Sequence, residues 1–137
     1  MGANLDLIRA TYEGSSSEEN GRNLLAALAP DAAWTEAEGF PYAGTYVGPD
    51  AIISGVFRRL ATEWTGYRAD VHTYLEDGDR VAAFGVYSGT YKATGKSMRA
   101  NFAHLYLLKN GKIASMTQYV DTAMVQKALE PAGHYAV

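Results

Sequence analysis

Residues 102–122 read FAHLYLLKNGKIASMTQYVDT, and this stretch predicts two long β-strands joined by a tight turn. Asn110 and Gly111 stand between two runs of apolar and β-favouring residues. An Asn-Gly pair in this setting is typical of a type I′ hairpin, because both central residues of that turn need a positive φ. The hairpin would bring His104, near the start of one strand, and Asp121, at the end of the other, to the same end of the ladder. We therefore expect a titratable pair beside many aromatic side chains.

The composition predicts one globular domain over residues 1–137. Of these residues, 47% are hydrophobic and 20% are charged, which is enough to bury a core without disulfides or metal. The formal net charge of −3 and the absence of any run of Lys and Arg argue against a nucleic-acid partner. With no cysteine, the chain has no disulfide, thiolate nucleophile or cysteine-ligated metal. Ten tyrosines suit a cavity with apolar walls and hydroxyl tips.

The N-terminal segment has neither the pattern of a signal peptide nor that of a membrane span, because residues 1–12 lack a continuous apolar run. We therefore expect a cytoplasmic protein with no membrane partner. We expect no metal, since His72, His104 and His134 lack ligand spacing. We expect no cofactor, because the glycine-rich loop near residue 44 lacks the Lys-Ser/Thr ending of a phosphate-binding loop.

The order of helical and strand periodicities predicts an α+β fold, in which helices and sheet are segregated. Apolar residues recur at helical spacing in the first half of the chain and alternate with a period of two from Tyr67 onwards. Glycines in or beside the strands indicate bends, so we expect a cone-shaped, curved antiparallel sheet wrapped around the helices. The predicted helices cover residues 4–13, the segment from the capping serines 15 and 16 to residue 28, residues 49–64 and residues 122–129. The predicted strands cover residues 33–36, 67–75, 81–91, 97–108 and 112–120. We expect a loop at residues 39–44 and a frayed tail from residue 131.

Five short motifs, taken in order, resemble the SnoaL-like branch of the nuclear transport factor 2-like superfamily. They are WTE at 34–36, FPYAGTYVG at 40–48, FAH at 102–104, GKI at 111–113 and QYVDT at 118–122. The resemblance runs from about Leu5 to Leu129, and the superfamily also contains ketosteroid isomerase and limonene epoxide hydrolase. It implies a cone-shaped, cystatin-like α+β barrel with an internal pocket, commonly a homodimer through the outer face of the sheet. It leaves the reaction open, because this fold hosts isomerases, cyclases, hydrolases and non-catalytic binders.

The resemblance assigns roles to Asp121 and His104. Asp121 matches the acid/base of SnoaL-type polyketide cyclases, and a carboxylate in an apolar cavity has a raised pKa that allows proton exchange near neutral pH. The alternative is that Asp121 caps the last helix. His104 matches the histidine of the FAH motif and shares a strand face with Phe102 and Tyr106. As a pocket residue it would donate to a carbonyl or shuttle protons with Asp121. The alternative is a core histidine whose nitrogens already have hydrogen-bond partners. Tyr119 would share the face of Asp121 in a regular strand.

Ketosteroid isomerase supplies two further candidates, Glu36 and Tyr12. Glu36 lies near the position of that enzyme's general base, and Tyr12 lies on the first predicted helix, where the enzyme has its oxyanion-binding tyrosine. The partner acid of the isomerase has no counterpart, since the nearest residues are Ala103 and His104. The Arg-x-Asp motif of limonene epoxide hydrolase is also incomplete, because Asn101 stands where the acid is needed. The resemblance therefore supplies neither complete catalytic set.

The resulting hypothesis is a small-molecule pocket protein of SnoaL-like type. As an enzyme it would be a cofactor-free isomerase or cyclase that moves a proton next to a carbonyl, with Asp121, His104 and Glu36 as catalytic residues. Its substrate would be a small apolar or aromatic molecule that carries a carbonyl. The alternatives are a non-catalytic ligand-binding domain with the same cavity, and a dimerising domain with a filled cone. The predicted substrate-binding residues are Tyr12, Trp34, Tyr46, Phe57, Trp64, Tyr87 and Tyr119.

Overall fold

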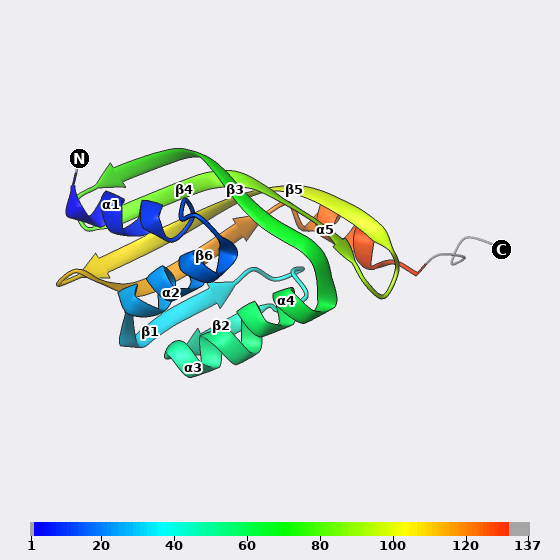
Figure 1. Cartoon of the computed structure of the whole chain (residues 1–137), viewed down its shortest axis with the longest axis horizontal. Coiled ribbons are helices and arrows are strands. Elements are labelled where there is room, and N and C mark those ends of the chain that lie inside the picture. The colour runs from blue at the N-terminus through cyan, green and yellow to red at the C-terminus, as the bar shows by residue number, and fades with distance from the viewer. Residues whose placement is uncertain (1, 132–137) are drawn as a thin grey trace.

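The fold consists of one curved six-stranded sheet with helices packed against it (Figure 1). A computed structural model describes residues 2–131. The tail predicted to be frayed lies outside the described residues, except for residue 131. The helices are α1 (Ala3–Ala10), α2 (Ser17–Ala27), α3 (Pro49–Ile52), the π-helical segment η1 (Ile53–Phe57), α4 (Arg58–Glu63) and α5 (Thr122–Leu129); the strands are β1 (Leu28–Glu36), β2 (Gly44–Val47), β3 (Trp64–Asp77), β4 (Arg80–Tyr91), β5 (Lys96–Lys109) and β6 (Lys112–Val120).

The predicted α+β class and the four-stranded antiparallel meander are confirmed. Strands β3, β4, β5 and β6 are neighbours in chain order, and each adjacent pair is antiparallel. The turn between β5 and β6 has φ values of 53° at Asn110 and 75° at Gly111, as a type I′ hairpin requires. Leu108 lies opposite Ile113 next to this turn.

Two strands that precede the meander complete the sheet, which is open and not the barrel that the resemblance implies. Strand β1 runs parallel to β6, and β2 adds to the other side of β1, so the sheet is mixed. The strand order β2-β1-β6-β5-β4-β3 leaves β2 and β3 at its two edges, and the sheet is therefore not closed into a barrel. Strand β1 starts at Leu28, earlier than predicted, because a register shift between Leu28 and Ala33 accommodates Pro30 in the ladder.

The long predicted helix over residues 49–64 is confirmed as three consecutive helical segments, α3, η1 and α4. Its apolar stripe is buried, as the burial of Ile52, Val56 and Leu60 shows. Its middle part is a π-helix, a feature that sequence periodicity does not reveal. Trp64 belongs to β3 and not to the helix. No helix among residues 2–131 is long and apolar enough to cross a membrane.

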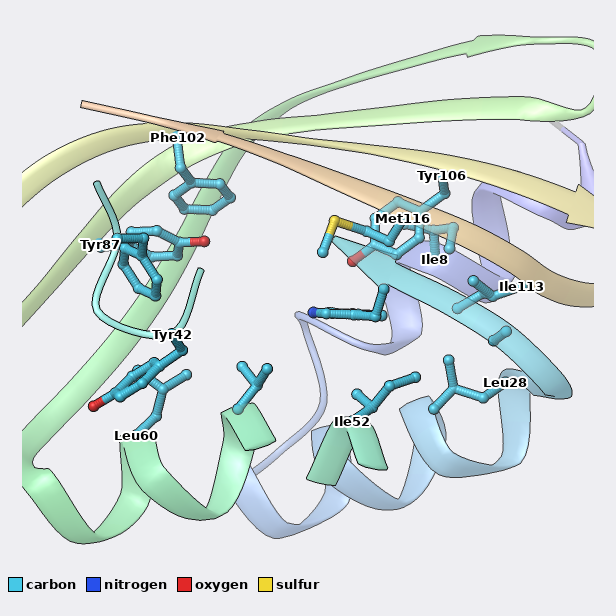
Figure 2. Close-up of a cluster of buried hydrophobic side chains, with 14 of the residues drawn as sticks. Ile8, Leu28, Tyr42, Ile52, Leu60, Tyr87, Phe102, Tyr106, Ile113 and Met116 are labelled. Carbon is cyan, nitrogen blue, oxygen red and sulfur yellow. The ribbon is translucent and has the colours of Figure 1, made fainter. Parts of the chain in front are cut away.

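The core lies between the sheet and the helices (Figure 2). Strand β5 contributes every second residue to this core, from Met98 to Leu108, and His104 is one of them. Tyr106 and Met116 point from the sheet towards the layer that contains Ile52, which comes from the long helix (Figure 2). The same alternation that buries the aromatic residues therefore carries the histidine into the interior.

Candidate functional site

His104 occupies the centre of a buried polar cluster on the inner face of β5. Its side chain has two hydroxyl partners: Nδ1 lies 2.5 Å from Tyr12 Oη, and Nε2 lies 2.5 Å from Tyr87 Oη. The residue is only 7% exposed, and burial lowers the pKa of the imidazole from 6.5 to about 3. The imidazole is therefore neutral near pH 7, with one nitrogen that donates and one that accepts.

Gln118 extends this cluster from the neighbouring strand, because it lies opposite His104 in the β5–β6 ladder. Its Oε1 accepts a hydrogen bond of 2.9 Å from the backbone N–H of Ala37, and its Nε2 donates to Tyr87 Oη at 2.8 Å. At the other end of the cluster, the hydroxyl of Tyr12 contacts the hydroxyl of Tyr106. We call these five connected side chains, Tyr106, Tyr12, His104, Tyr87 and Gln118, the polar chain.

Glu36 supplies a buried carboxyl group next to Gln118 of the polar chain. It ends β1, is 4% exposed, and its Oε2 accepts a hydrogen bond of 2.9 Å from Trp34 Nε1. Burial raises the pKa of Glu36 from 4.5 to about 7, although hydrogen bonds from Trp34 and Gln118 oppose the rise. A carboxyl group with this pKa exists in both protonation states near neutral pH, so it can accept a proton and return it.

Aromatic side chains surround Glu36 and the polar chain. The ring of Trp34 lies edge-on to Phe57, with centroids 5.4 Å apart, and to Tyr106 at 6.1 Å. Tyr87 stacks on Phe102 at 4.2 Å. Within residues 2–131, every buried side-chain nitrogen and oxygen has a hydrogen-bond partner. The site therefore combines an apolar surrounding, which strengthens electrostatic interactions, with polar groups that already have partners.

The structure brings five of the predicted site residues to this cluster and two others to the surface. Glu36, His104, Tyr12, Trp34 and Tyr87 meet inside, as described above, and Phe57 packs beside them.

The expected positions of Asp121 and Tyr119 require correction. The side chain of Tyr119 is 56% exposed on the outer face of β6. Asp121 is exposed, and its carboxylate accepts a hydrogen bond from the backbone N–H of Met124 at 3.4 Å, so it caps α5. The physical reason is the alternation of β6, which turns Gln118 inward and Tyr119 outward. The sequence did not predict a role for Gln118, because a regular hairpin would place Thr117 opposite His104.

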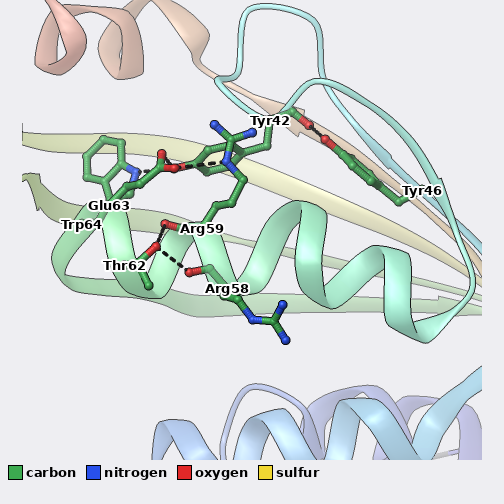
Figure 3. A network of polar contacts seen from close by, with 7 residues as sticks. All are labelled: Tyr42, Tyr46, Arg58, Arg59, Thr62, Glu63 and Trp64. Atoms are coloured by element: carbon green, nitrogen blue, oxygen red, sulfur yellow. Dashed lines mark hydrogen bonds and ion pairs between the residues drawn. The ribbon is translucent and has the colours of Figure 1, made fainter.

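The other two predicted binding residues, Trp64 and Tyr46, hold the loop between β1 and β2 (Figure 3). Tyr42 of this loop is fully buried; its hydroxyl donates to Glu63 Oε1 at 2.7 Å and accepts from Trp64 Nε1 at 3.1 Å. The hydroxyl of Tyr46 donates to the carbonyl of Tyr42 at 2.8 Å, and the guanidinium of Arg59 lies 4.4 Å from the centre of the Tyr42 ring. Since this loop follows Glu36 directly, these contacts fix the backbone next to the buried carboxyl.

Two hollows on the surface lie away from the polar chain. The first has a volume of about 470 Å³ and is lined by Leu28, Pro30, Val47, Gly48, Pro49, Asp50 and Ala51. The second has a volume of about 460 Å³ and is lined by Ala29, Asp31, Leu107, Lys109, Asn110, Lys112, Ala114 and Ser115. Neither hollow includes Glu36 or His104, so a pocket around these two residues stays a prediction. Within the described part of the chain, no three His, Asp or Glu side chains are grouped so as to hold a metal ion.

The fold and the matching family model define the class of this protein. A model of the SnoaL-like domain matches residues 8–116, and the chain therefore belongs to the SnoaL-like family. Its fold is the nuclear transport factor 2-like, or cystatin-like, α+β fold.

Three solved structures illustrate the relationship. An NTF2-like protein from Burkholderia thailandensis is 39% identical, the match covers 96% of this chain and 100% of the other, and the TM-score is 0.89. An NTF2-like protein of unknown function from Burkholderia pseudomallei is 28% identical, with 93% and 98% covered and a TM-score of 0.83. TerC, co-crystallised with polyporic acid, is 25% identical, with 93% and 98% covered and a TM-score of 0.80. No protein with a curated description matches the chain.

Proposed function

We propose that the chain binds a small, mainly apolar carbonyl compound and moves a proton at the carbon next to the carbonyl, without a cofactor. The observation that carries this proposal is the buried carboxyl of Glu36, whose pKa burial raises to about 7. A general base works best when its pKa lies near the working pH, because it is then available in the basic form and can still release the proton afterwards. An exposed carboxylate with an ordinary pKa would be a much weaker base.

The proposed step starts with the transfer of the proton from the α-carbon to an oxygen of Glu36. The electron pair of the broken C–H bond moves into the new C=C bond, and the carbonyl oxygen takes the negative charge. Hydrogen-bond donors in the polar chain, with His104 at its centre, stabilise this enolate. Return of the proton from Glu36 to a different carbon of a conjugated enolate gives isomerisation. In aldol cyclisation the enolate carbon forms a bond to a second carbonyl carbon of the same molecule, the π pair of that C=O bond moves to its oxygen, and this oxygen takes the proton from Glu36.

The surroundings of the carboxyl support an apolar or aromatic substrate. The rings of Trp34, Phe57 and Tyr106 pack edge to face beside Glu36, and such surfaces favour flat apolar molecules. The co-crystallisation of TerC with polyporic acid supports small-molecule binding by relatives of this chain.

The test is the exchange of α-protons for deuterium in a panel of small cyclic ketones and diketones, followed by proton NMR in D2O. Glu36→Gln keeps the shape of the side chain and removes its basicity, so we expect a loss of at least about 100-fold in exchange rate. Asp121→Asn is the matched control, because it changes a carboxylate at the surface, and its rate should stay within about twofold of wild type. Unchanged exchange in Glu36→Gln would refute the role of this carboxyl, and a loss confined to Asp121→Asn would restore the role predicted for Asp121.

A second candidate function is non-catalytic binding of a small ligand at the same place. The observation that favours it is that every buried polar side-chain atom of the described residues already has a partner, as in a rigid binding domain. This alternative predicts saturable binding that survives Glu36→Gln, with no exchange or product after long incubation.

We also propose a homodimer through the outer face of the sheet. Phe84, Ala103 and Tyr119 lie side by side across β4, β5 and β6, and their side chains point away from the core. Leu75 and Leu105 are exposed near them on the same face. This apolar patch on an unpaired sheet face is of the kind that marks interaction sites. Cytoplasmic localisation remains a prediction from the sequence.

The dimer is tested by sedimentation equilibrium of two variants. Leu105→Glu places a charge in the patch and should give a monomer. Leu25→Glu changes an exposed leucine of α2, away from the sheet face, and should leave the association state unchanged. A monomeric wild type, or equal behaviour of both variants, would refute the interface.

A further inference from the structure

The loop between β1 and β2, residues 37–43, begins directly after the buried carboxyl of Glu36. Loops generally run over the surface of a protein, but this loop buries two aromatic rings. Phe40 is 4% exposed and Tyr42 is 1% exposed, and both belong to the hydrophobic core. The loop therefore closes the core at the end of β1 where Glu36 lies.

Two consecutive turns direct Phe40 inward. The backbone N–H of Phe40 donates to the carbonyl of Ala37, and the N–H of Ala43 donates to the carbonyl of Phe40, each at 3.1 Å. Gly39 is the third residue of the first turn and has a φ of 90°, a value that favours glycine. Pro41 is the second residue of the second turn, where its ring presets the backbone. The local sequence therefore encodes a short flap, residues 38–41, with one aromatic ring on its inner side.

The ring of Phe40 lies against Tyr87 of the polar chain, with the ring centroids 6.0 Å apart. The hydroxyl of Tyr87 contacts Nε2 of His104 at 2.5 Å, and its ring also stacks on Phe102 (Figure 2). Planar rings pack favourably on such an aromatic surface. Removal of the ring of Phe40 would therefore uncover a place for a planar ligand beside the polar chain.

Two contacts of different kinds hold the flap. At its C-terminal end, the next residue, Tyr42, is bound to Glu63 and Trp64 inside the protein (Figure 3). On the outside, the side-chain amide of Gln126 in α5 donates to the carbonyl of Gly39 at 2.6 Å, and this contact is exposed. Because a local opening costs only the contacts that it breaks, the flap can open while Tyr42 stays in place.

A ligand reaches the buried site only if part of its covering moves. Glu36 and His104 are almost completely buried, and the two surface hollows do not include them. Residues 38–41 belong to neither β1 nor β2, so their movement breaks no hydrogen bond of the ladder between these strands. Loops that open and close over a site commonly control the entry of ligands.

We propose that residues 38–41 form a flap that opens to admit a ligand, and that Phe40 is the ring that the ligand displaces. The ligand class is a planar aromatic or cyclic compound, whose ring takes the place of Phe40 against Tyr87, and this part rests on the proposed function. A ligand that binds only the open form has an affinity reduced by the fraction of molecules in which the flap is open. The exposed contact between Gln126 and Gly39 therefore controls the affinity without touching the ligand.

Hydrogen exchange of the two tryptophan indole protons tests the opening without any ligand or activity. Trp34 Nε1–H is bound to Glu36 in the site, and Trp64 Nε1–H is bound to Tyr42, which stays in place. The two NMR signals are assigned with Trp64→Phe, and exchange in D2O is followed at low urea concentrations. We expect Trp34 to exchange faster and with little dependence on urea, and Trp64 to exchange through global unfolding with its full urea dependence. Equal rates and equal urea dependences of the two protons would overturn the proposal.

Gln126→Ala removes the contact between α5 and the flap in the same experiment. The loss of one hydrogen bond should accelerate the exchange of the Trp34 proton by about fivefold and leave that of Trp64 unchanged. Lys127→Ala is the matched control, because it changes the next exposed residue of α5, and both rates should stay within about twofold of wild type. An unchanged Trp34 rate in Gln126→Ala would show that the flap does not cover the site.

Titration with 2-naphthol, a planar aromatic compound, tests the entry of a ligand through the shifts of the same indole signals. Gln126→Ala should tighten binding by the same factor by which it accelerates exchange, about fivefold. Phe40→Ala removes the displaced ring and should tighten binding by at least about tenfold; if this variant does not fold, Gln126→Ala carries the test. Unchanged affinity in Gln126→Ala, or no binding to any of these proteins, would overturn the entry role. Loss of α-proton exchange with these results intact would refute only the proposed function.

Discussion

Replacement of Glu36 by Gln removes a group whose ionisation is linked to folding, mainly because burial raises its pKa from 4.5 to about 7. Below pH 4.5 the carboxyl holds its proton in both the folded and the unfolded chain. Between pH 4.5 and about 7 the unfolded chain has lost the proton and the folded chain still binds it. The free energy of unfolding therefore falls as the pH rises through this window, and the loss is complete above it.

The size of this effect follows from the two pKa values. The difference between 4.5 and about 7, at 1.36 kcal/mol for each pH unit, corresponds to about 3 kcal/mol. Since Gln does not titrate, the stability of Glu36→Gln relative to wild type should increase by about 3 kcal/mol between acid and alkaline pH. Under the proposed function the variant loses activity, and relative to wild type it gains stability as the pH rises through this window.

His104 contributes a pH dependence of the opposite sign. Burial lowers its pKa from 6.5 to about 3, so below pH 6.5 the unfolded chain binds a proton that the folded chain excludes. The contribution of His104 to stability is therefore present above pH 6.5 and is lost as the pH falls towards 3. Wild type and Glu36→Gln share this term, and it cancels in the difference between them.

Urea unfolding, followed by tryptophan fluorescence from below pH 4.5 to above pH 7, measures the difference. Asp121→Asn serves as the control, because it changes a carboxylate at the surface and the amide oxygen can still cap α5. Parallel stability curves for wild type and Glu36→Gln would refute the raised pKa, and with it the physical basis of the proposed base.

Three further substitutions test contacts that surround the site, each by urea unfolding. Asp121→Ala removes the N-cap of α5 and should lower the free energy of unfolding by about 1 kcal/mol, whereas unchanged stability would contradict the cap. A Cβ at Gly55 would lie 2.2 Å from the ring of Tyr46, so Gly55→Ala should cost about 1–3 kcal/mol, and a neutral result would show that the ring moves freely. Tyr42→Phe leaves a buried indole N–H without its acceptor and should cost about 1–3 kcal/mol; a smaller cost than for an exposed tyrosine would contradict the burial of that contact.

Features that depend on neighbours in the chain could be predicted from the sequence. The turn at Asn110 and Gly111 formed as expected, because positive φ is a property of these two residues themselves. The stripe from Ile52 to Leu60 faces the core because helical spacing fixes its direction. The family resemblance named Glu36 and Tyr12 as candidates. The contact of Tyr12 with His104 is seen only in the structure, since contacts between distant segments leave no local pattern.

Partners that are distant in the sequence could not be predicted in this way. Strand β1 pairs with β6 in parallel, and the two are separated by the whole meander. Locally, Pro30 and the apolar residues before it also fit the end of a helix. The pairing of Leu28 with Ile113 of β6 makes this segment the start of β1. Tertiary contacts decide between the two local conformations here.

The position of Asp121 outside the core has a single structural cause, an extra residue in β6. In a regular hairpin that pairs Leu108 with Ile113, Thr117 would lie opposite His104, and residues 119 and 121 would share its inner face. The ladder instead pairs residue 107 with residue 115, so Ala114 forms a β-bulge and the register beyond it shifts by one residue.

This shift exchanges the two faces of β6 beyond the bulge. It turns Tyr119 and Asp121 outward and places the amide of Gln118 against the polar chain. A hydroxyl at that position could donate or accept, whereas an amide oriented by a backbone N–H can only donate to Tyr87. The bulge therefore decides which polar groups of β6 reach the inner face, and this choice is not visible in the hydrophobic pattern of the strand.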